Sequence, residues 1–285
     1  MVGGLYGNEA ALDAVLRLFD AETGRKQLVF NGDFHWFDTD PATFERIQHS
    51  VLSHTALRGN VETELASPAP VSDAGCGCAY PDWVGDGVVD RSNRILQRLW
   101  ATTTPRQRQQ LAALPMWLTA TVGDRRIGIV HGDAQSLAGW GFAQEHLAEA
   151  AHREQARVWI ERAEVDAFAS SHTCLPVFQR LTMRHRTTPC WIFNNGAAGM
   201  PNFRGDAAGL LTRIATSACK GTHSRSTTRL EDIHVDVLAI ETDATRAQHA
   251  FLNQWPPGSD AHVSYFDRIA SGPDYHPHQV IRLED

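Results

Sequence analysis

The sequence predicts an α/β protein in which layered sheets are flanked by helices. Helix-type and strand-type patterns alternate early in the chain, whereas strands follow one another later. Alternating helices cover a sheet and consecutive strands extend it, so this order favours a layered α/β architecture. The 285 residues are 42% hydrophobic and 21% charged, which allows a substantial core. No repeat or clear linker divides the chain, and we expect a single domain over residues 1–285.

Apolar residues at helical spacing predict the helices, and short apolar runs predict the strands between them. Helices are expected over residues 9–19, from about 40 onward, across 89–113, over 142–163 and, after a capping Ser259, over 260–270. Strands are expected near residues 28–30, 116–122, 126–130, 165–169, 177–183, 190–194, 209–215 and 234–240. Gly, Pro and Ser are frequent in residues 66–88, which we interpret as a loop insertion, and a turn-rich C-terminal extension follows residue 256.

Composition and charge argue against several classes of protein. A net charge of −7 disfavours nonspecific binding to nucleic acid or to an anionic membrane. No stretch approaches the roughly 18 apolar residues of a membrane span, and no secretory leader is visible. Five cysteines do not suggest a disulfide framework, and a bond between Cys76 and Cys78 would be strained. We expect a cytoplasmic protein with a small-molecule ligand; a homo-oligomer is compatible with the sequence.

Four polar residues follow short apolar runs at turns that contain Gly or Ser: Asp33, Asn60, His131 and His172. The carboxyl ends of strands in α/β sheets present such side chains toward a shared crevice. One carboxylate, one amide oxygen and two imidazoles suit a divalent transition metal such as Mn, Fe or Zn. Taken singly, Asp33 and Asn60 are equally well explained as turn formers, and His131 or His172 is better explained as a buried histidine, but the ordered set favours a metal site.

In this order the turns resemble those of the calcineurin-like metallophosphoesterases, most closely the small bacterial and archaeal phosphodiesterase branch. That family carries D-x-H-G-N, G-D, G-N-H-E/D, H-G and G-H-x-H. The matching segments here are Gly4-Leu5-Tyr6-Gly7-Asn8, Gly32-Asp33, Gly59-Asn60-Val61-Glu62, His131-Gly132 and Ser171-His172-Thr173-Cys174. The resemblance covers roughly residues 3–215. It implies a four-layer α/β/β/α sandwich, in which two mixed sheets are flanked by helices.

The resemblance also implies a two-metal site of which one half is altered. It makes Asp33 the bridging ligand and assigns Asn60, His131 and His172 to one metal. The ligands that bind only the other metal would be at positions 4, 6 and 174. Those positions hold Gly4, Tyr6 and Cys174, which are poor substitutes for Asp and His. We therefore expect one ion, although two remain conceivable if Cys174, with Cys76 or Cys78, rebuilds a site for a softer metal. Packing as a free thiol is the alternative for Cys174.

Three further residues are candidates for catalysis or substrate binding. His35 is placed as a proton donor if its turn faces the metal, and otherwise as part of an aromatic turn beside Trp36. Tyr6 either binds a phosphate oxygen or fills the space of the missing metal, and we favour filling. Asn8 either positions a phosphate or caps the next helix, and we favour capping. An aromatic wall for a substrate ring at residues 139–142 is as well explained by core packing.

Three functions remain open at this point. The favoured one is a metal-dependent phosphoesterase, a hydrolase acting on a phosphodiester, a phosphomonoester or a nucleotide. The alternative is a non-catalytic interaction or scaffold protein on the same fold, comparable to the retromer subunit that resembles these enzymes. A metal or redox sensor that uses Cys76, Cys78 and Cys174 is the third.

Overall fold

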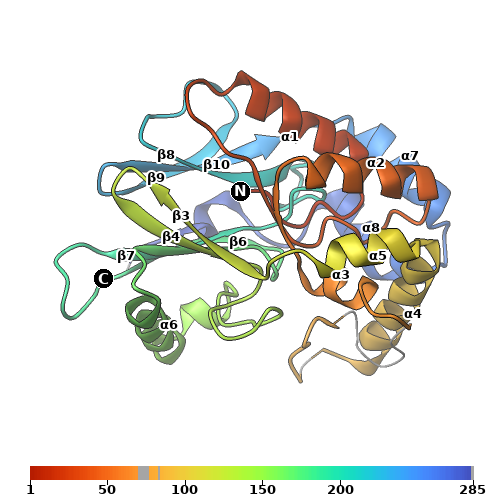
Figure 1. Ribbon diagram of the computed structural model, residues 1–285, viewed down its shortest axis with the longest axis horizontal. Helices are drawn as coiled ribbons and strands as arrows, with labels where there is room; N and C mark the ends of the chain where they lie inside the picture. Colours follow the sequence, from red (N-terminus) through yellow and green to blue (C-terminus); the bar gives the residue numbers. More distant parts are fainter. Residues whose placement is uncertain (70–76, 83, 284–285) are drawn as a thin grey trace.

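Two β-sheets lie face to face in the middle of the protein, and helices cover their outer faces (Figure 1). The structure is a computed structural model and describes residues 1–69, 77–82 and 84–283. In spatial order the larger, mixed sheet contains β11 (Ile281–Arg282), β6 (Pro176–Leu181), β7 (Cys190–Asn195), β5 (Ala167–Ser170), β4 (Arg125–Val130) and β3 (Trp117–Val122). β4, β5 and β7 run parallel, so their carboxyl ends meet at one edge.

The second sheet is assembled around the first residues of the chain. β1 (Val29–Asn31) pairs in parallel with β2 (Thr55–Leu57), and β10 (Ile233–Ile240) pairs antiparallel with β8 (Gly209–Ala215) and β9 (Ser224–Leu230). Met1 and Thr212 exchange two hydrogen bonds, of 2.7 and 3.0 Å, and Val2 bridges to Phe30. The N-terminal segment therefore acts as a very short strand that joins the two groups into one layer.

Three apolar clusters fill the spaces between four layers. The first joins sheet residues such as Leu211 to α1 (Glu9–Ala21), α2 (Pro41–Leu52), α3 (Asn60–Leu65), α4 (Asp86–Thr102), α5 (Pro105–Ala112), α7 (Ala244–Gln254) and α8 (Asp260–Ser271). The second, with Ile129 and Val235, lies between the sheets. The third packs α6 (Ala150–Ala163) against the outer face of the larger sheet. The predicted α/β/β/α sandwich is confirmed.

Local signals explain where the first helices begin. The side-chain oxygen of Asn8 accepts a hydrogen bond from the backbone N–H of Ala11, 3.0 Å away, and Asn8 thus caps α1. Asp40 caps α2 in the same way through the N–H of Thr43, and Pro41 occupies the first helical position. Ser259 precedes α8 as expected, but its side chain makes no capping bond.

Some expectations were wrong in detail. The helix expected over 142–163 begins only at Ala150, after a short 3₁₀ turn at His146–Ala148. β9 was not predicted because its sequence, SRSTTRL, has no apolar alternation; cross-strand pairing to β10 holds it in place. α7 was also missed, although Asp243 caps it. The part of the loop insertion at residues 70–76 lies outside the described residues. Among those described, no helix has the length and apolar character needed to cross a bilayer.

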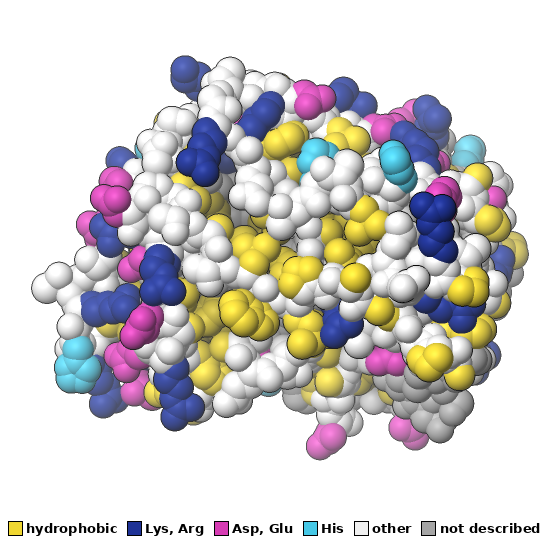
Figure 2. Space-filling model, in the orientation of Figure 1, with side chains coloured by type: hydrophobic (Ala, Val, Ile, Leu, Met, Phe, Trp, Pro, Cys, Tyr) yellow, Lys and Arg dark blue, Asp and Glu magenta, His cyan; other side chains and the backbone are white. Residues whose placement is uncertain are grey.

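Hydrophobic side chains gather on the face of the molecule that carries β3 and β4 (Figure 2). Trp117 is 66% exposed at the start of β3, next to Met116. A groove of about 640 Å³ runs beside them and is lined in part by Val130 and Phe168. β3 is the outermost strand of its sheet, and Trp159 of α6 also lines the groove.

A buried arginine ties the first helix to the second sheet. The guanidinium of Arg213 on β8 makes two hydrogen bonds to the carboxylate of Glu22, at 2.8 and 2.9 Å, just after α1. It also donates to Asp236 on β10 at 3.0 Å. The side chains of Arg213 and Asp236 are almost fully buried, so each charge depends on the other for compensation.

We expect Arg213→Met to lower the free energy of unfolding by about 3 kcal/mol, because the buried Asp236 carboxylate loses its cation. Urea denaturation at pH 7 measures the change. The matched control is Arg225→Met, which removes half-exposed ion pairs to Asp206 and Glu241 and should cost less than about 1 kcal/mol. Equal losses in the two variants would contradict the prediction.

Candidate metal centre

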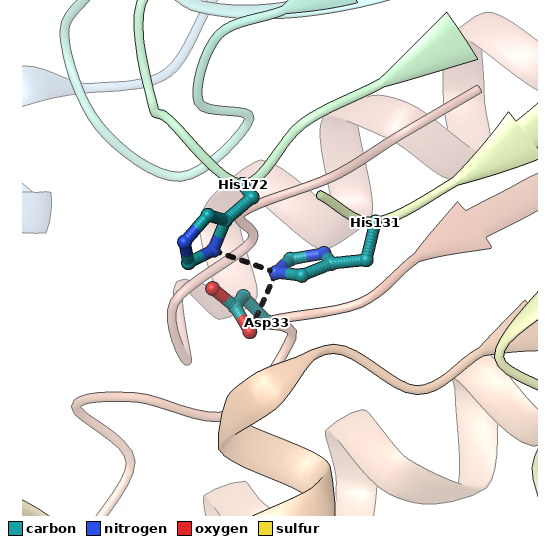
Figure 3. Close-up of side chains that lie close together, drawn as sticks. All are labelled: Asp33, His131 and His172. Carbon is teal, nitrogen blue, oxygen red and sulfur yellow. Dashed lines mark hydrogen bonds and ion pairs between the residues drawn. The ribbon is translucent and has the colours of Figure 1, made fainter. Parts of the chain in front are cut away.

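The four residues predicted to bind metal meet at the carboxyl ends of four strands. Asp33 follows β1, Asn60 begins α3 directly after β2, and His131 and His172 follow β4 and β5. Figure 3 shows Asp33, His131 and His172 pointing toward one another. All four side chains are buried, with relative exposures between 1% and 6%. The fold thus brings together residues that are up to 139 positions apart (172 − 33).

The atoms that face one another are close enough to share one ligand. His131 Nε2 lies 3.0 Å from Asn60 Oδ1, 3.3 Å from Asp33 Oδ1 and 3.2 Å from His172 Nδ1. The ligand atoms of Asp33, His131 and His172 all fall within 4.8 Å of one another. One carboxylate oxygen, one amide oxygen and two imidazole nitrogens therefore surround a common point.

Outer hydrogen bonds determine which atom of each group carries hydrogen. His131 Nδ1 lies 2.8 Å from the carbonyl of Asn31, and His172 Nε2 lies 3.2 Å from the carbonyl of Cys78. A carbonyl only accepts, so these nitrogens are the protonated ones, as inferred from the network. The amide nitrogen of Asn60 donates to Cys78 Sγ. The nitrogens and oxygens that face the centre consequently present lone pairs.

A buried ring of lone pairs is repulsive unless a cation or a proton lies among them. The donor set matches the nitrogen and oxygen ligands that Mn, Fe and Zn accept. Carbonyl groups behind each imidazole, holding its tautomer and orientation, are the usual arrangement for metal-binding histidines. The geometry therefore fits a divalent transition metal held by Asp33, Asn60, His131 and His172.

Electrostatics within the cluster agree with this interpretation. Burial raises the pKa of Asp33, but the charge and hydrogen bond of His131 outweigh it, so the pKa is lowered and the group is a carboxylate. Burial lowers the pKa of His131, but Asp33 and the Asn31 carbonyl raise it above its usual value. Burial, reinforced by the charge of His131, lowers the pKa of His172 to about 4. His172 is thus neutral at physiological pH, and a proton competes mainly for His131.

Glu62 holds the two turns that carry Asp33 and Asn60, a role that the sequence analysis missed. Its carboxylate accepts hydrogen bonds from the backbone N–H groups of Asp33 (2.7 Å), Gly59 (2.9 Å), Phe34 (3.0 Å) and His35 (3.2 Å). The side chain is fully buried. The only signal in the sequence was its place in the Gly-Asn-Val-Glu motif.

Two glycines are required where these turns approach the ligands. A Cβ atom on Gly32, whose φ is +76°, would lie 2.5 Å from His131 Nδ1. A Cβ on Gly59 would lie 2.4 Å from Asp33 Oδ1. Only a residue without a side chain lets the backbone come this close.

Tyr6 and Cys174 lie beside each other at positions where the sequence resemblance implies ligands of a second metal. The Tyr6 hydroxyl and Cys174 Sγ are 2.7 Å apart, and the thiol also lies 3.2 Å from the carbonyl of His172. A Cβ on Gly4 would lie 2.8 Å from the Tyr6 ring, so the ring occupies the space beside that position. Burial raises the pKa of both Tyr6 and Cys174, and both stay neutral. This placement supports the space-filling interpretation of Tyr6.

Among the described residues, the metal cluster does not include Cys174, whose sulfur is engaged by Tyr6. Cys78 is disulfide-bonded, so its sulfur is not available as a free thiolate. Gly77 and Ala79 have positive φ angles on either side of it, a tight turn that the sequence did not predict. Cys76 lies outside the described residues.

The structure places His35 and Asn8 in structural roles. His35 is fully buried, stacks on Phe44 with ring centroids 3.7 Å apart, and its Nδ1 lies 2.5 Å from Asp38. This environment favours the aromatic-turn interpretation over proton donation to a substrate. Asn8 caps α1 through its oxygen and donates from its amide nitrogen to the carbonyl of Gly199 at 3.0 Å, so the fold uses both ends of its side chain.

We expect Glu62→Gln to lower the free energy of unfolding by about 2 kcal/mol and to weaken metal binding. Each carboxylate oxygen accepts from two backbone N–H groups, so either orientation of the amide points a donor at donors. Urea denaturation measures stability, and elemental analysis measures retained metal. Glu64→Gln, on the same helix, is the control and should change neither by much. A Glu62 variant as stable as the control would refute the role of Glu62 in holding the two turns.

Two solved structures share this fold over nearly the whole chain. A hypothetical protein from Pyrococcus horikoshii OT3 superposes with a TM-score of 0.61 at 14% sequence identity, covering 96% of this chain and 98% of its own. A metallophosphoesterase from Sphaerobacter thermophilus superposes with a TM-score of 0.58 at 16% identity, covering 95% and 98%. Comparison of the sequence with protein-family models and with curated proteins gives no match. The likeness concerns architecture: this chain has the metallophosphoesterase fold.

Proposed function

We propose that this protein is a metal-dependent phosphoesterase that works with one transition-metal ion. The observation that carries the proposal is the ring of lone pairs from Asp33, Asn60, His131 and His172, held by outer hydrogen bonds. A divalent cation at such a site polarises a phosphoryl group and lowers the pKa of a water molecule. The fold that this chain shares with a metallophosphoesterase from Sphaerobacter thermophilus supports the proposal.

The side chains of this protein perform the positioning in that reaction. Asp33 contributes negative charge, which strengthens cation binding, while His131 and His172 contribute neutral nitrogen ligands. Glu62 keeps the Asp33 and Gly59 turns at a fixed separation. We propose a phosphodiester, a phosphomonoester or a nucleotide as the substrate, because these esters present the anionic oxygens that a cation polarises.

A single ion is favoured by what surrounds the second position. The Tyr6 ring and the Cys174 thiol are in contact there and are both neutral. Neutral, mutually bonded groups offer little to a second cation, whereas a carboxylate and imidazoles would attract one. With one cation rather than two, less positive charge is available to stabilise the transition state.

The same feature favours a second candidate, a non-catalytic scaffold. Tyr6 fills the second position, and the four candidate ligands are buried, as expected if catalysis were lost. The phosphoesterase is preferred because a scaffold has no need of four converging ligand atoms. Metal content separates the two candidates.

We expect purified protein to contain about one equivalent of Mn, Fe or Zn, and His131→Ala to reduce both the metal and the hydrolysis of an activated aryl phosphodiester to background. Elemental analysis and a chromogenic assay measure the two quantities. Cys174→Ser should keep its metal, and His276→Ala, at a half-exposed histidine, should keep both properties. Metal-free, fully stable wild-type protein would favour the scaffold instead.

Metal affinity should fall as pH decreases, because a proton and the cation compete for His131. The pKa of His131 is raised, so the loss begins at a higher pH than for an ordinary histidine, whereas His172, with a pKa of about 4, contributes only in stronger acid. Isothermal titration with Mn²⁺ or Zn²⁺ between pH 5 and pH 8 tests this. Affinity that does not change over this range would contradict it.

A further inference from the structure

A segment of the loop insertion lies directly against the metal centre. Its described part, residues 77–82, brings the carbonyl of Cys78 within 3.2 Å of His172 Nε2. The same carbonyl accepts a second hydrogen bond, of 2.9 Å, from the indole N–H of Trp140. Cys78 Sγ accepts from the amide of Asn60 at 3.3 Å. Two of the four candidate ligands therefore donate their outer hydrogen bonds to one residue of this segment.

Trp140 contacts both the segment and a metal ligand. Its ring meets the ring of His172 nearly edge to face, with centroids 5.6 Å apart and planes at 81°. On its other side it lies 6.4 Å from the ring of Tyr80. The Tyr80 hydroxyl is 3.0 Å from Ser92 Oγ, which anchors the segment to α4. Trp140 thus contacts both the segment and His172.

The backbone around Trp140 is itself tightly fixed. A Cβ on Gly139 would lie 2.0 Å from the Asp133 carboxylate, and a Cβ on Gly141 would lie 2.6 Å from Trp159. The Asp133 carboxylate also accepts from the N–H of Gly141 at 3.0 Å. These contacts hold the indole in place independently of the segment it binds.

We propose that Trp140 is a positioning residue for the metal centre. By holding the Cys78 carbonyl against His172 Nε2, it keeps the hydrogen on that nitrogen and leaves Nδ1 free to face the cation. The proposal rests on the metal site of the proposed function and adds a residue that does not touch the cation. Without the indole N–H, the carbonyl is less constrained, His172 loses its preferred tautomer, and residues 77–82 open more often.

Trp140→Phe is the decisive variant, because it keeps an aromatic ring and removes the N–H donor, and its loss of ring size is matched by the control variant. We expect Co²⁺-loaded variant protein to release its metal to a chelator about fivefold faster than wild type, the effect of one lost hydrogen bond. The visible absorption of bound Co²⁺ should shift as the coordination loosens. Amide hydrogen exchange over residues 77–82 should accelerate in the same variant, with the rest of the protein unchanged.

Trp191→Phe is the matched control. Trp191 on β7 is equally an indole and is buried, and its Nε1 has no hydrogen-bond partner among the described residues, so this change removes no hydrogen bond seen in the structure. It should leave metal release, the Co²⁺ spectrum and exchange over residues 77–82 as in wild type.

Identical metal release and identical exchange in the two variants would overturn the role of Trp140 while leaving the metal centre intact. Loss of hydrolysis without faster metal release in Trp140→Phe would also overturn it. Wild-type protein that binds Co²⁺ but hydrolyses no phosphate ester would refute the proposed enzyme alone. Wild-type protein that does not bind Co²⁺ would refute the metal centre and, with it, the positioning role of Trp140.

Discussion

Asp33, Asn60, His131 and His172 present lone pairs to a shared point inside the core, where little water reaches them. Such an arrangement costs free energy unless a positive charge compensates it, so the surrounding structure must enforce it. Backbone carbonyls behind His131 and His172 direct their hydrogens outward. The Glu62 carboxylate holds both adjoining turns, and glycines allow the close approach. Many contacts at this edge of the sheets therefore serve to hold these four side chains together.

The altered half of the centre follows a different principle. Where the resemblance implies ligands for a second cation, this chain has a tyrosine ring and a thiol, which are in contact with each other and neutral. Tyr6 and Cys174 both adopt a left-handed backbone, as does Asp33 nearby. Positive φ in non-glycine residues tends to occur at functional sites, where the rest of the fold enforces it. Left-handed residues thus occur both at the carboxylate Asp33 and at the neutral Tyr6 and Cys174.

The loop insertion connects the centre to the helical layer. Residues 77–82 reach Asn60 and His172 on one side and, through Tyr80, α4 on the other. A segment that accepts hydrogen bonds from two candidate ligands influences how those ligands are oriented. Substitutions in the insertion therefore act on the candidate ligand His172 through the Cys78 carbonyl and the indole of Trp140.

Much of the architecture was determined by local features of the sequence. Asn8 and Asp40 place the starts of α1 and α2, because a side-chain oxygen before an amphipathic helix satisfies its first N–H groups. Apolar runs place β4 and β5, and polar residues at their ends identify candidate ligands. β9 was not predicted because pairing with β10 holds it in place, whereas its own sequence has no apolar alternation.

Residue type alone left the roles of several site residues undecided, because a side chain's direction depends on what packs around it. His35 stacks on Phe44 and pairs with Asp38 in the core, two residues beyond Asp33 in the same turn. Glu62 holds the turns of the centre through four backbone N–H groups contributed by segments far apart in the chain. The candidate ligands were thus predicted from the sequence itself, through short motifs at strand ends. Tautomer, orientation and the outer hydrogen bonds were decided only by the tertiary structure, because they come from residues that are distant in sequence.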